Sequence, residues 1–280
     1  MIPQSSQLNV INFPRRLRLV GELIREFEND YFTRRKRTPK SESTWNAEYG
    51  YVFKRLPQDA PLTCELIFQT IETTEPDTRN RKRFCQNLSI LAKFAGLTVD
   101  LKPYVGKYSC LKPAPRKLPT DQAIVECYSN IQPDDWRWFF GMLAAYGLRP
   151  HEVFHLDYEK LREGDECLRV LDGKTGSRLA FPFKPEWFTD FHLTEVNVPK
   201  CTGKNNTDLG NRVCHAFKRL EIPCKPYDLR HAWAVRSMTY GLDITLAAQQ
   251  MGHSLMVHSR VYHQWISERV HRQAYEALKQ

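Results

Sequence analysis

The chain has 280 residues, a formal net charge of +9 and a sequence pI near 9.1. Hydrophobic residues make up 41% and aromatic residues 12%, enough to fill one large core or two ordinary ones, which excludes an intrinsically disordered chain. No apolar stretch reaches the ~18 residues of a membrane span, and residues 1–18 show no secretory signal, so we expect a cytoplasmic protein. The basic balance favours an anionic partner, either nucleic acid or an anionic membrane surface.

The positive charge is concentrated in the first part of the chain. Residues 1–112 hold 19 Lys and Arg against 12 Asp and Glu, a surplus of +7. Residues 113–280 hold 22 against 20, a surplus of only +2. The amino-terminal part is therefore expected to make broad contacts with a polyanion, and the remainder to use a few placed cations.

The amino-terminal part predicts a small helical bundle. Apolar residues recur at helical spacing in three segments, and a proline is expected to open a fourth helix. These elements are 17–32, 44–56, a helix opened by Pro61, and 78–95.

A run of four cations follows the first predicted helix and precedes a break at Pro39. The run consists of Arg34, Arg35, Lys36 and Arg37. It is either a solvated surface or a set of phosphate contacts, and the sequence leaves both readings open.

Residues 102–119 are typical of an interdomain linker, because they combine prolines and cations without a helical period. We place the domain boundary near residue 112. Domains of 1–112 and 113–280 follow from this boundary.

The second domain begins with a helix capped by Thr120, followed by a buried helix over 136–146 that ends at Gly147. Residues 167–171 and 178–183 predict two strands of a hairpin around a glycine-bounded turn. Helical patterns also cover the segments 152–156, 211–220, 228–240, 244–251 and 267–279.

Five short motifs stand in a fixed order in the second half of the chain. They are Gly-Leu-Arg-Pro-His-Glu at 147–152, Gly-Lys-Thr-Gly-Ser-Arg at 173–178, Tyr-Asp-Leu-Arg-His at 227–231, Gly-His-Ser at 252–254 and Arg-Val-Tyr-His at 260–263. This set resembles the tyrosine recombinase (phage integrase) family, whose members cut DNA with a tyrosine and rejoin it to a new partner. The resemblance covers residues 115–280 by motif and residues 15–105 only by general character.

The resemblance implies catalytic roles for five of the motif residues. Arg149 and Arg230 would clamp the scissile phosphate, because a guanidinium stays charged and donates paired hydrogen bonds. Lys174, in the hairpin turn, would protonate the leaving 5′ hydroxyl. His253 would donate to the phosphate, and Tyr262 would attack it to form a 3′-phosphotyrosyl link.

Tyr227 departs from the family pattern, in which a histidine stands three residues before the second arginine. A tyrosine at this place can donate a hydrogen bond to the phosphate but is a poor base while neutral. The acceptor of the nucleophile's proton is therefore left open between the phosphate, water and His253, and a protein that is slower than its relatives is the further alternative. Tyr227 is kept in the catalytic set as a hydrogen-bond donor.

Neighbouring residues are given supporting roles. Glu152 is expected to cap its turn or to orient Arg149, three residues before it. Arg178 is expected to contact the DNA backbone. His231 follows Arg230 directly and is expected to point elsewhere and to be structural.

The resemblance also implies an architecture and partners. The fold would be mainly helical, with a small β-hairpin in the catalytic domain 113–280 and a helical core-binding domain in 1–112. The two domains would form a C-shaped clamp around double-stranded DNA, usually as a homo-tetramer on two duplexes. The carboxy-terminal segment would dock on the next protomer, and accessory DNA-bending or directionality proteins are further candidate partners. The protein would serve a mobile element or a resolution system, and no membrane partner is implied.

Two alternatives remain open at this level. A type IB topoisomerase would use the same chemistry but reseal the same strand as a monomer. A protein that has lost catalysis would only occupy DNA sites, a reading that Tyr227 alone favours.

No metal or other cofactor is expected. The chain has no P-loop and no acidic cluster spaced for magnesium, and the bond energy in this family's chemistry is stored in the phosphotyrosine link. The eight cysteines form no Cys-x-x-Cys pair, which favours reduced thiols over a zinc site.

Overall fold

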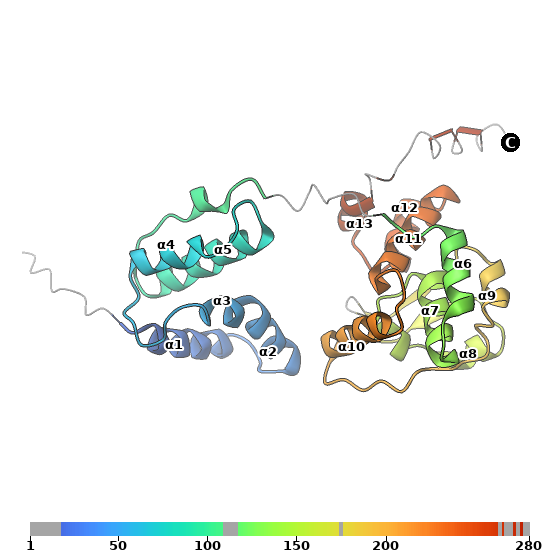
Figure 1. The fold of residues 1–280 in the computed structure, drawn as a ribbon, viewed down its shortest axis with the longest axis horizontal. Coiled ribbons are helices and arrows are strands. Elements are labelled where there is room, and N and C mark those ends of the chain that lie inside the picture. Colours follow the sequence, from blue (N-terminus) through green and yellow to red (C-terminus); the bar gives the residue numbers. More distant parts are fainter. Residues whose placement is uncertain are drawn as a thin grey trace, which may run out of the picture. The chain divides into compact units, whose positions relative to one another are not determined.

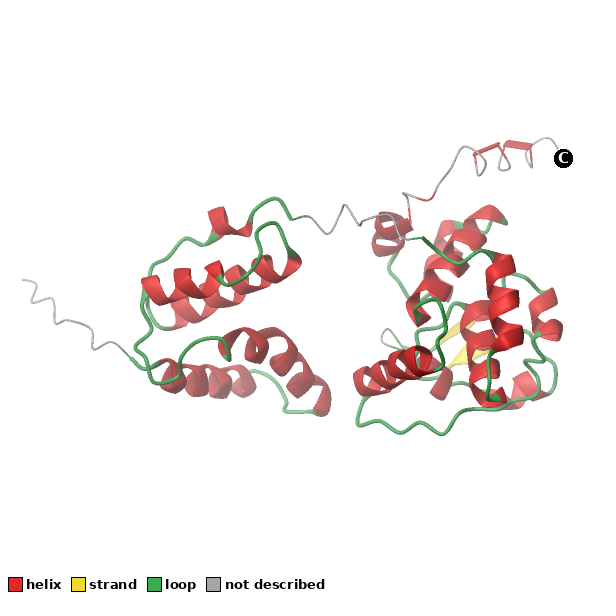
Figure 2. Cartoon of the chain, in the orientation of Figure 1, coloured by secondary structure: helices red, strands yellow, loops and turns green. Residues whose placement is uncertain are grey.

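The computed structural model describes residues 18–108, 117–173, 176–262, 265, 271–272 and 275–276. The chain divides into two compact units, Met1–Cys110 and Leu111–Gln280, coloured from blue to green and from green to red in Figure 1. Within the described residues both units are mostly helical, and the two strands lie in the second unit (Figure 2). None of the helices in these ranges is long and apolar enough to cross a membrane.

The first unit is a helical bundle, as its apolar periodicity predicts. Its elements are α1 (Val20–Thr33), α2 (Pro39–Trp45), the π-helical turn η1 (Asn46–Gly50), α3 (Tyr51–Phe53), α4 (Cys64–Glu72), α5 (Arg79–Phe94) and the 3-10 turn η2 (Lys102–Val105).

The expectation that Pro61 opens a helix is wrong. Pro61 instead forms an isolated bridge with Leu19, and α4 begins after Thr63, whose side chain accepts a hydrogen bond from the backbone N–H of Leu66 at 3.1 Å. A side-chain oxygen of this kind satisfies an otherwise unpaired donor of the first helical turn. The cap, rather than the proline, therefore sets the start of the helix.

Aromatic side chains fill the core of the first unit. The ring of Phe27 on α1 lies 5.7 Å from that of Trp45 and 5.2 Å from that of Phe94, centroid to centroid. These rings come from α1, α2 and α5, so their contacts join helices that are distant in sequence. Buried aromatic pairs of this type add about 0.5–1.5 kcal/mol each beyond the burial of their area.

The second unit has more elements and two core clusters. Its elements are α6 (Asp121–Asn130), α7 (Asp134–Tyr146), the 3-10 turn η3 (Glu152–Phe154), α8 (Tyr158–Arg162), β1 (Leu168–Val170), β2 (Arg178–Ala180), α9 (Glu186–Asp190), α10 (Asn206–Arg219), α11 (Pro226–Thr239), α12 (Ile244–Gln250) and α13 (Leu255–Tyr262).

Helix α7 forms the centre of the second unit and packs against α6, α9 and α11. Ten of its residues are buried, which confirms the predicted buried helix. Gly147 ends α7 in the left-handed conformation, with φ of 61°. A Cβ atom at Gly147 would lie 2.6 Å from Cγ of Trp233, so the close approach of α11 requires glycine here.

The predicted hairpin is present with shorter strands. Strand β1 pairs antiparallel with β2, with Leu168 opposite Ala180 and Val170 opposite Arg178. The predicted cap at Thr120 is also confirmed, since its side chain accepts from the N–H of Ala123 at 3.2 Å. Helices α8, α9 and α13 lack a clear apolar period and are therefore not predicted from the sequence. Most of the helix predicted over 267–279 lies outside the described residues.

Candidate active site

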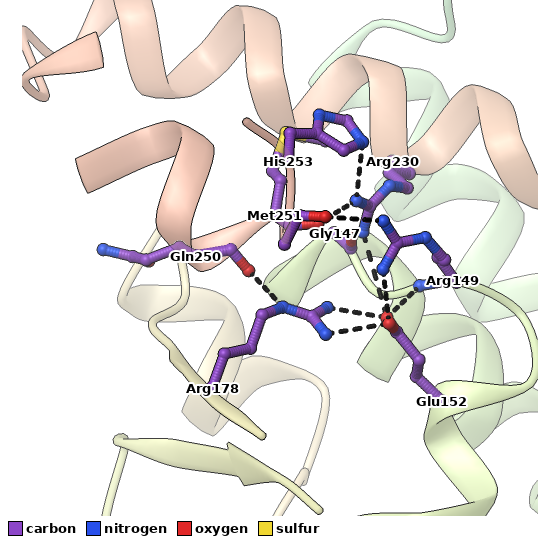
Figure 3. Close-up of polar contacts among 9 residues, drawn as sticks. Gly147, Arg149, Glu152, Arg178, Arg230, Gln250, Met251 and His253 are labelled. Atoms are coloured by element: carbon purple, nitrogen blue, oxygen red, sulfur yellow. Dashed lines mark hydrogen bonds and ion pairs between the residues drawn. The ribbon is translucent and has the colours of Figure 1, made fainter. Parts of the chain in front are cut away.

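The candidate site gathers side chains from separate parts of the second unit. Arg149 and Glu152 follow α7, Arg178 begins β2, and Arg230 lies in the second turn of α11. His253 stands in the turn between α12 and α13. Figure 3 shows these five side chains converging on one place although they lie far apart in the sequence.

The carboxylate of Glu152 is the centre of this arrangement. Arg149 donates its backbone N–H to one carboxylate oxygen and its guanidinium to the other, both at 2.7 Å. Arg178 donates to both oxygens, at 2.8 and 2.6 Å. The guanidinium of Arg230 makes a longer ion pair of 3.9 Å with the same group. The expected contact of Glu152 with Arg149 is therefore present, and Glu152 orients two further arginines.

Positive charge exceeds negative charge in this cluster. The side chains of Arg149, Arg178, Arg230 and Glu152 are only 9%, 7%, 2% and 0% exposed. Burial alone would raise the pKa of Glu152, but its hydrogen bonds to Arg178 and the three guanidinium charges lower that pKa to about 2. Three cations thus share one carboxylate among the described residues, and the surplus of two positive charges suits an anionic ligand.

Backbone oxygens hold Arg230 in place. One guanidinium nitrogen donates to the carbonyl of Gly147 at 2.6 Å, and another donates to the carbonyl of Met251. Arg149 likewise donates to the carbonyl of Gly252 at 2.9 Å. Burial, then the charge of Arg149, lowers the pKa of Arg230 to about 10, so the group remains charged at neutral pH. Two buried arginines are therefore fixed around the turn that precedes α13.

His253 is bound to this pair as a neutral imidazole. Arg230 donates to its Nε2 at 3.1 Å. Burial and the charges of Arg230 and Arg149 lower the pKa of His253 to about 3. Because Nε2 accepts, the neutral ring carries its proton on Nδ1, which is buried and has no hydrogen-bond partner in the described part of the chain.

Tyr262 ends α13 and is 1% exposed. Its hydroxyl lies 3.0 Å from Nδ1 of His231 on α11. Its ring packs against that of His258, with 4.7 Å between centroids, and is stacked 6.3 Å from that of His253. Since His253 also contacts Arg230, the tyrosine and the arginine cluster belong to one connected site.

The structure corrects the expectation for His231. The sequence reading has this side chain point elsewhere, because it follows Arg230 directly. It instead contacts the hydroxyl of Tyr262, because the carboxy-terminal end of α13 approaches the side of α11 that carries His231. Helical spacing within α11 describes where its side chains point, but it does not reveal which element lies opposite them.

His258 is a site residue that sequence reasoning missed. It is fully buried within α13, and neither ring nitrogen has a hydrogen-bond partner in the described ranges. Burial, then the charge of Arg230, lowers its pKa to about 4. Its position four residues before Tyr262 on the same helix was the available signal, because residues at this spacing share a helical face.

Three further residues are predicted to contact DNA: Lys174, Tyr227 and Arg178. Lys174 lies outside the described residues. Tyr227 lies one turn before Arg230 on α11 and is 42% exposed, and none of the hydrogen bonds found between described residues involves its hydroxyl. Arg178 is paired with Glu152 and donates to the carbonyl of Gln250 at 2.7 Å, so its buried guanidinium is turned toward the site.

The predicted cation run belongs to the first unit and is exposed. Arg34 pairs with Asp30, and Arg37 lies 3.4 Å from Glu28. The guanidinium of Arg35 lies over the ring of Tyr31, 4.3 Å from its centroid. The run is therefore anchored by neighbouring acids and aromatic rings while its side chains face solvent.

Metal and disulfide chemistry find no support in the described ranges. No group of three or more His, Cys, Asp or Glu side chains there could hold a metal ion. The seven cysteines described are free thiols.

A family model and two curated relatives all relate the chain to excisases. Residues 21–105 match the family described as the XisA/XisC excisase second domain. Excisase A from Nostoc sp. (strain PCC 7120) is 30% identical over 281 residues, which cover 89% of this chain and 59% of that protein. Excisase C from the same organism is 28% identical over 280 residues, covering 89% and 55%. The chain is similar to these two excisases over most of its own length.

Solved structures identify the fold of the chain. The integrase of transposon Tn1549, in complex with a circular intermediate DNA, matches with a TM-score of 0.55 and 14% identity, covering 93% of this chain and 99% of that one. The resemblance to tyrosine recombinases, predicted from the motifs, is thereby confirmed at the level of fold. The chain spans between half and two thirds of the length of the two curated relatives that it matches.

Proposed function

We propose that the chain is a site-specific DNA recombinase that cuts and rejoins DNA through a 3′-phosphotyrosyl intermediate. The observation that carries this proposal is the buried surplus of positive charge beside Tyr262. Arg149 and Arg230 supply charge that a phosphodiester can neutralise, and a phenol stands in the same connected site. The homology to excisases favours excision of a DNA element as the direction of the reaction.

In the proposed cleavage step, the oxygen of Tyr262 attacks the scissile phosphorus and the bond from phosphorus to the 5′ oxygen breaks. Arg149 and Arg230 stabilise the charge that builds on the non-bridging oxygens. Lys174 gives a proton to the departing 5′ oxygen. A 5′ hydroxyl of a partner strand then attacks the phosphotyrosine, which restores the phenol and completes the exchange.

The remaining site residues act on this step in three ways. Glu152 positions the arginines, and Arg178 supports Glu152 rather than the DNA backbone. Tyr227, exposed one turn before Arg230, donates to a phosphate oxygen. His253 becomes a donor to the phosphate when its Nε2 is released from Arg230, since a neutral imidazole can donate from only one nitrogen at a time.

The wider assembly is part of the same proposal. The first unit serves as the core-binding domain and the second as the catalytic domain, and together they close around double-stranded DNA. The working form is a homo-tetramer on two duplexes, assisted by DNA-bending or directionality proteins. The DNA-bound state of the Tn1549 integrase supports a DNA partner for this chain.

A nicked suicide substrate tests the proposal. A duplex carrying the target site, nicked so that the cleaved end diffuses away, should trap a covalent adduct, seen as a shifted band after denaturation. Tyr262→Phe should abolish the adduct and leave DNA binding nearly unchanged, because only the hydroxyl is lost. Tyr240→Phe is the matched control, since Tyr240 is 57% exposed and should not affect the yield.

The same experiment separates the alternatives. A normal adduct yield from Tyr262→Phe would contradict the assignment of the nucleophile. Absence of any adduct from the unaltered chain would favour a protein that only occupies DNA sites. Adducts without strand exchange between two duplexes would favour a topoisomerase that reseals the same strand.

A further inference from the structure

Three histidine rings surround Tyr262 in the described part of the site. His231 comes from α11, His258 from α13 and His253 from the turn that precedes α13. Their ring centroids lie 5.6, 4.7 and 6.3 Å from that of the phenol. A buried phenol becomes a nucleophile only after losing its proton, so the site needs an acceptor within hydrogen-bond distance.

The hydrogen bonds distinguish these histidines. His253 already accepts from Arg230 through Nε2, so its available lone pair is occupied. Neither nitrogen of His258 has a hydrogen-bond partner in the described ranges, and its ring meets the phenol by packing. His231 places Nδ1 3.0 Å from the hydroxyl oxygen, which is an ordinary hydrogen-bond distance.

Position 227, where the family has a histidine, cannot supply a proton acceptor in this chain. Tyr227 is a phenol and a poor base while neutral, and its side chain is 42% exposed on α11. His231 lies four residues further along the same helix, more than one turn away. The phenol of Tyr262 contacts this later position instead.

We propose that His231 is a catalytic residue that accepts the proton of Tyr262 through Nδ1 during DNA cleavage and returns it during rejoining. The inference rests on the proposed recombinase function, because it assigns a step of that reaction. In cleavage, the bond from Tyr262 oxygen to phosphorus forms while its proton moves to Nδ1. In rejoining, the phosphotyrosine bond breaks and the imidazolium gives the proton back to the phenol.

Three titratable groups beside this pair, Arg230, His253 and His258, each keep one protonation state near neutral pH. Arg230 on α11 stays charged there, and α12 carries no ionisable side chain. The pKa values of His253 and His258 are lowered to about 3 and about 4 by burial and nearby arginine charge, so both rings are neutral above pH 5. A rate change between pH 5 and pH 8 would therefore not come from His253 or His258.

His231→Asn is the decisive variant. Asparagine can keep a hydrogen bond near the position of Nδ1 but cannot accept a proton, so single-turnover adduct formation should fall about 10²–10⁴-fold. Because a base must be unprotonated to act, the unaltered chain should gain rate as pH rises, and the variant should lose this rise. His192→Asn is the matched control, because His192 is exposed and its φ of 48° suits asparagine.

Two further measurements keep the inference open to refutation. A substrate with sulfur in place of the bridging 5′ oxygen has a leaving group that needs no proton, so a base defect should persist with it. Recovery of His231→Asn on this substrate would assign His231 to the leaving group and overturn the proposal. The proposal would also be overturned if His231→Asn formed the adduct at the same rate, and with the same pH profile, as the unaltered chain.

Nitrogen-15 NMR of the histidine rings tests the pairing without DNA or catalysis. If Nδ1 of His231 accepts the hydrogen bond from Tyr262, the ring must be neutral with its proton on Nε2. Tyr262→Phe removes this hydrogen bond and should shift the Nδ1 resonance. A protonated Nδ1 at pH 8 would overturn the proposal even if the unaltered chain formed no adduct. Failure of the recombinase function would appear separately, as absence of adduct from the unaltered chain.

Discussion

At the scale of single residues, Glu152 determines the geometry of the candidate site. It is fully buried and receives hydrogen bonds from Arg149 and Arg178, with Arg230 in ion-pair range. Removing one partner of a buried ion pair leaves uncompensated charge in a poorly solvated place. Here the removal would leave three guanidinium groups facing one another.

Glu152→Gln should therefore be strongly destabilising. The change keeps the side-chain shape but removes the negative charge, and we expect a loss of about 3–5 kcal/mol in the free energy of unfolding, measured by denaturant titration. Glu42→Gln is a matched control, because Glu42 pairs with Arg37 at an exposed site and should change stability by less than about 1 kcal/mol. Equal effects of the two changes would contradict the central role of Glu152.

At the scale of elements, the contact between the end of α13 and α11 completes the site. It brings the hydroxyl of Tyr262 to His231, and the rings of His253 and His258, whose pKa values are lowered, lie against that of Tyr262. Because His253 and His258 are neutral when buried but protonate in the unfolded chain near their ordinary pKa of ~6.5, the folded state binds fewer protons below that pH. Their contribution to stability is complete above about pH 6.5 and declines as pH falls toward their folded pKa values of about 3 and about 4.

This linkage predicts that the folded state loses stability as pH falls below about 6.5. Between pH 6.5 and pH 5 the free energy of unfolding should fall by up to about 1.4 kcal/mol per pH unit for each buried histidine. His258→Leu should reduce this slope, whereas His192→Asn, at an exposed histidine, should leave it unchanged. Denaturant titrations at several pH values give the slopes, and identical slopes for the unaltered chain and His258→Leu would refute the assignment.

At the scale of the whole molecule, the uneven charge distribution predicts how the chain binds DNA. The first 112 residues carry the surplus of +7, and the exposed run at 34–37 is held by ion pairs and aromatic rings. Exposed ion pairs contribute little to stability, so phosphates can replace the carboxylates at small cost. Binding should release counterions and weaken steeply with salt.

Replacing the run with glutamine tests this contribution. Substitution of Arg34, Arg35, Lys36 and Arg37 together should flatten the plot of log affinity against log salt by up to about one unit for each lost phosphate contact. Lysine in place of the three arginines preserves charge and should keep the slope. A slope unaffected by the glutamine changes would identify the run as solvated surface.

The sequence by itself determined the helical first unit, the buried helix α7 with its glycine stop, the hairpin and the order of the motif residues. These features depend on local periodicity, capping and backbone conformation, which are encoded within a few residues. The contacts of Glu152 with Arg178, and of Tyr262 with His231, join residues 26 and 31 positions apart. Only the tertiary structure decided these contacts, because they depend on which faces of β2, α11 and α13 meet, and no local pattern specifies that choice.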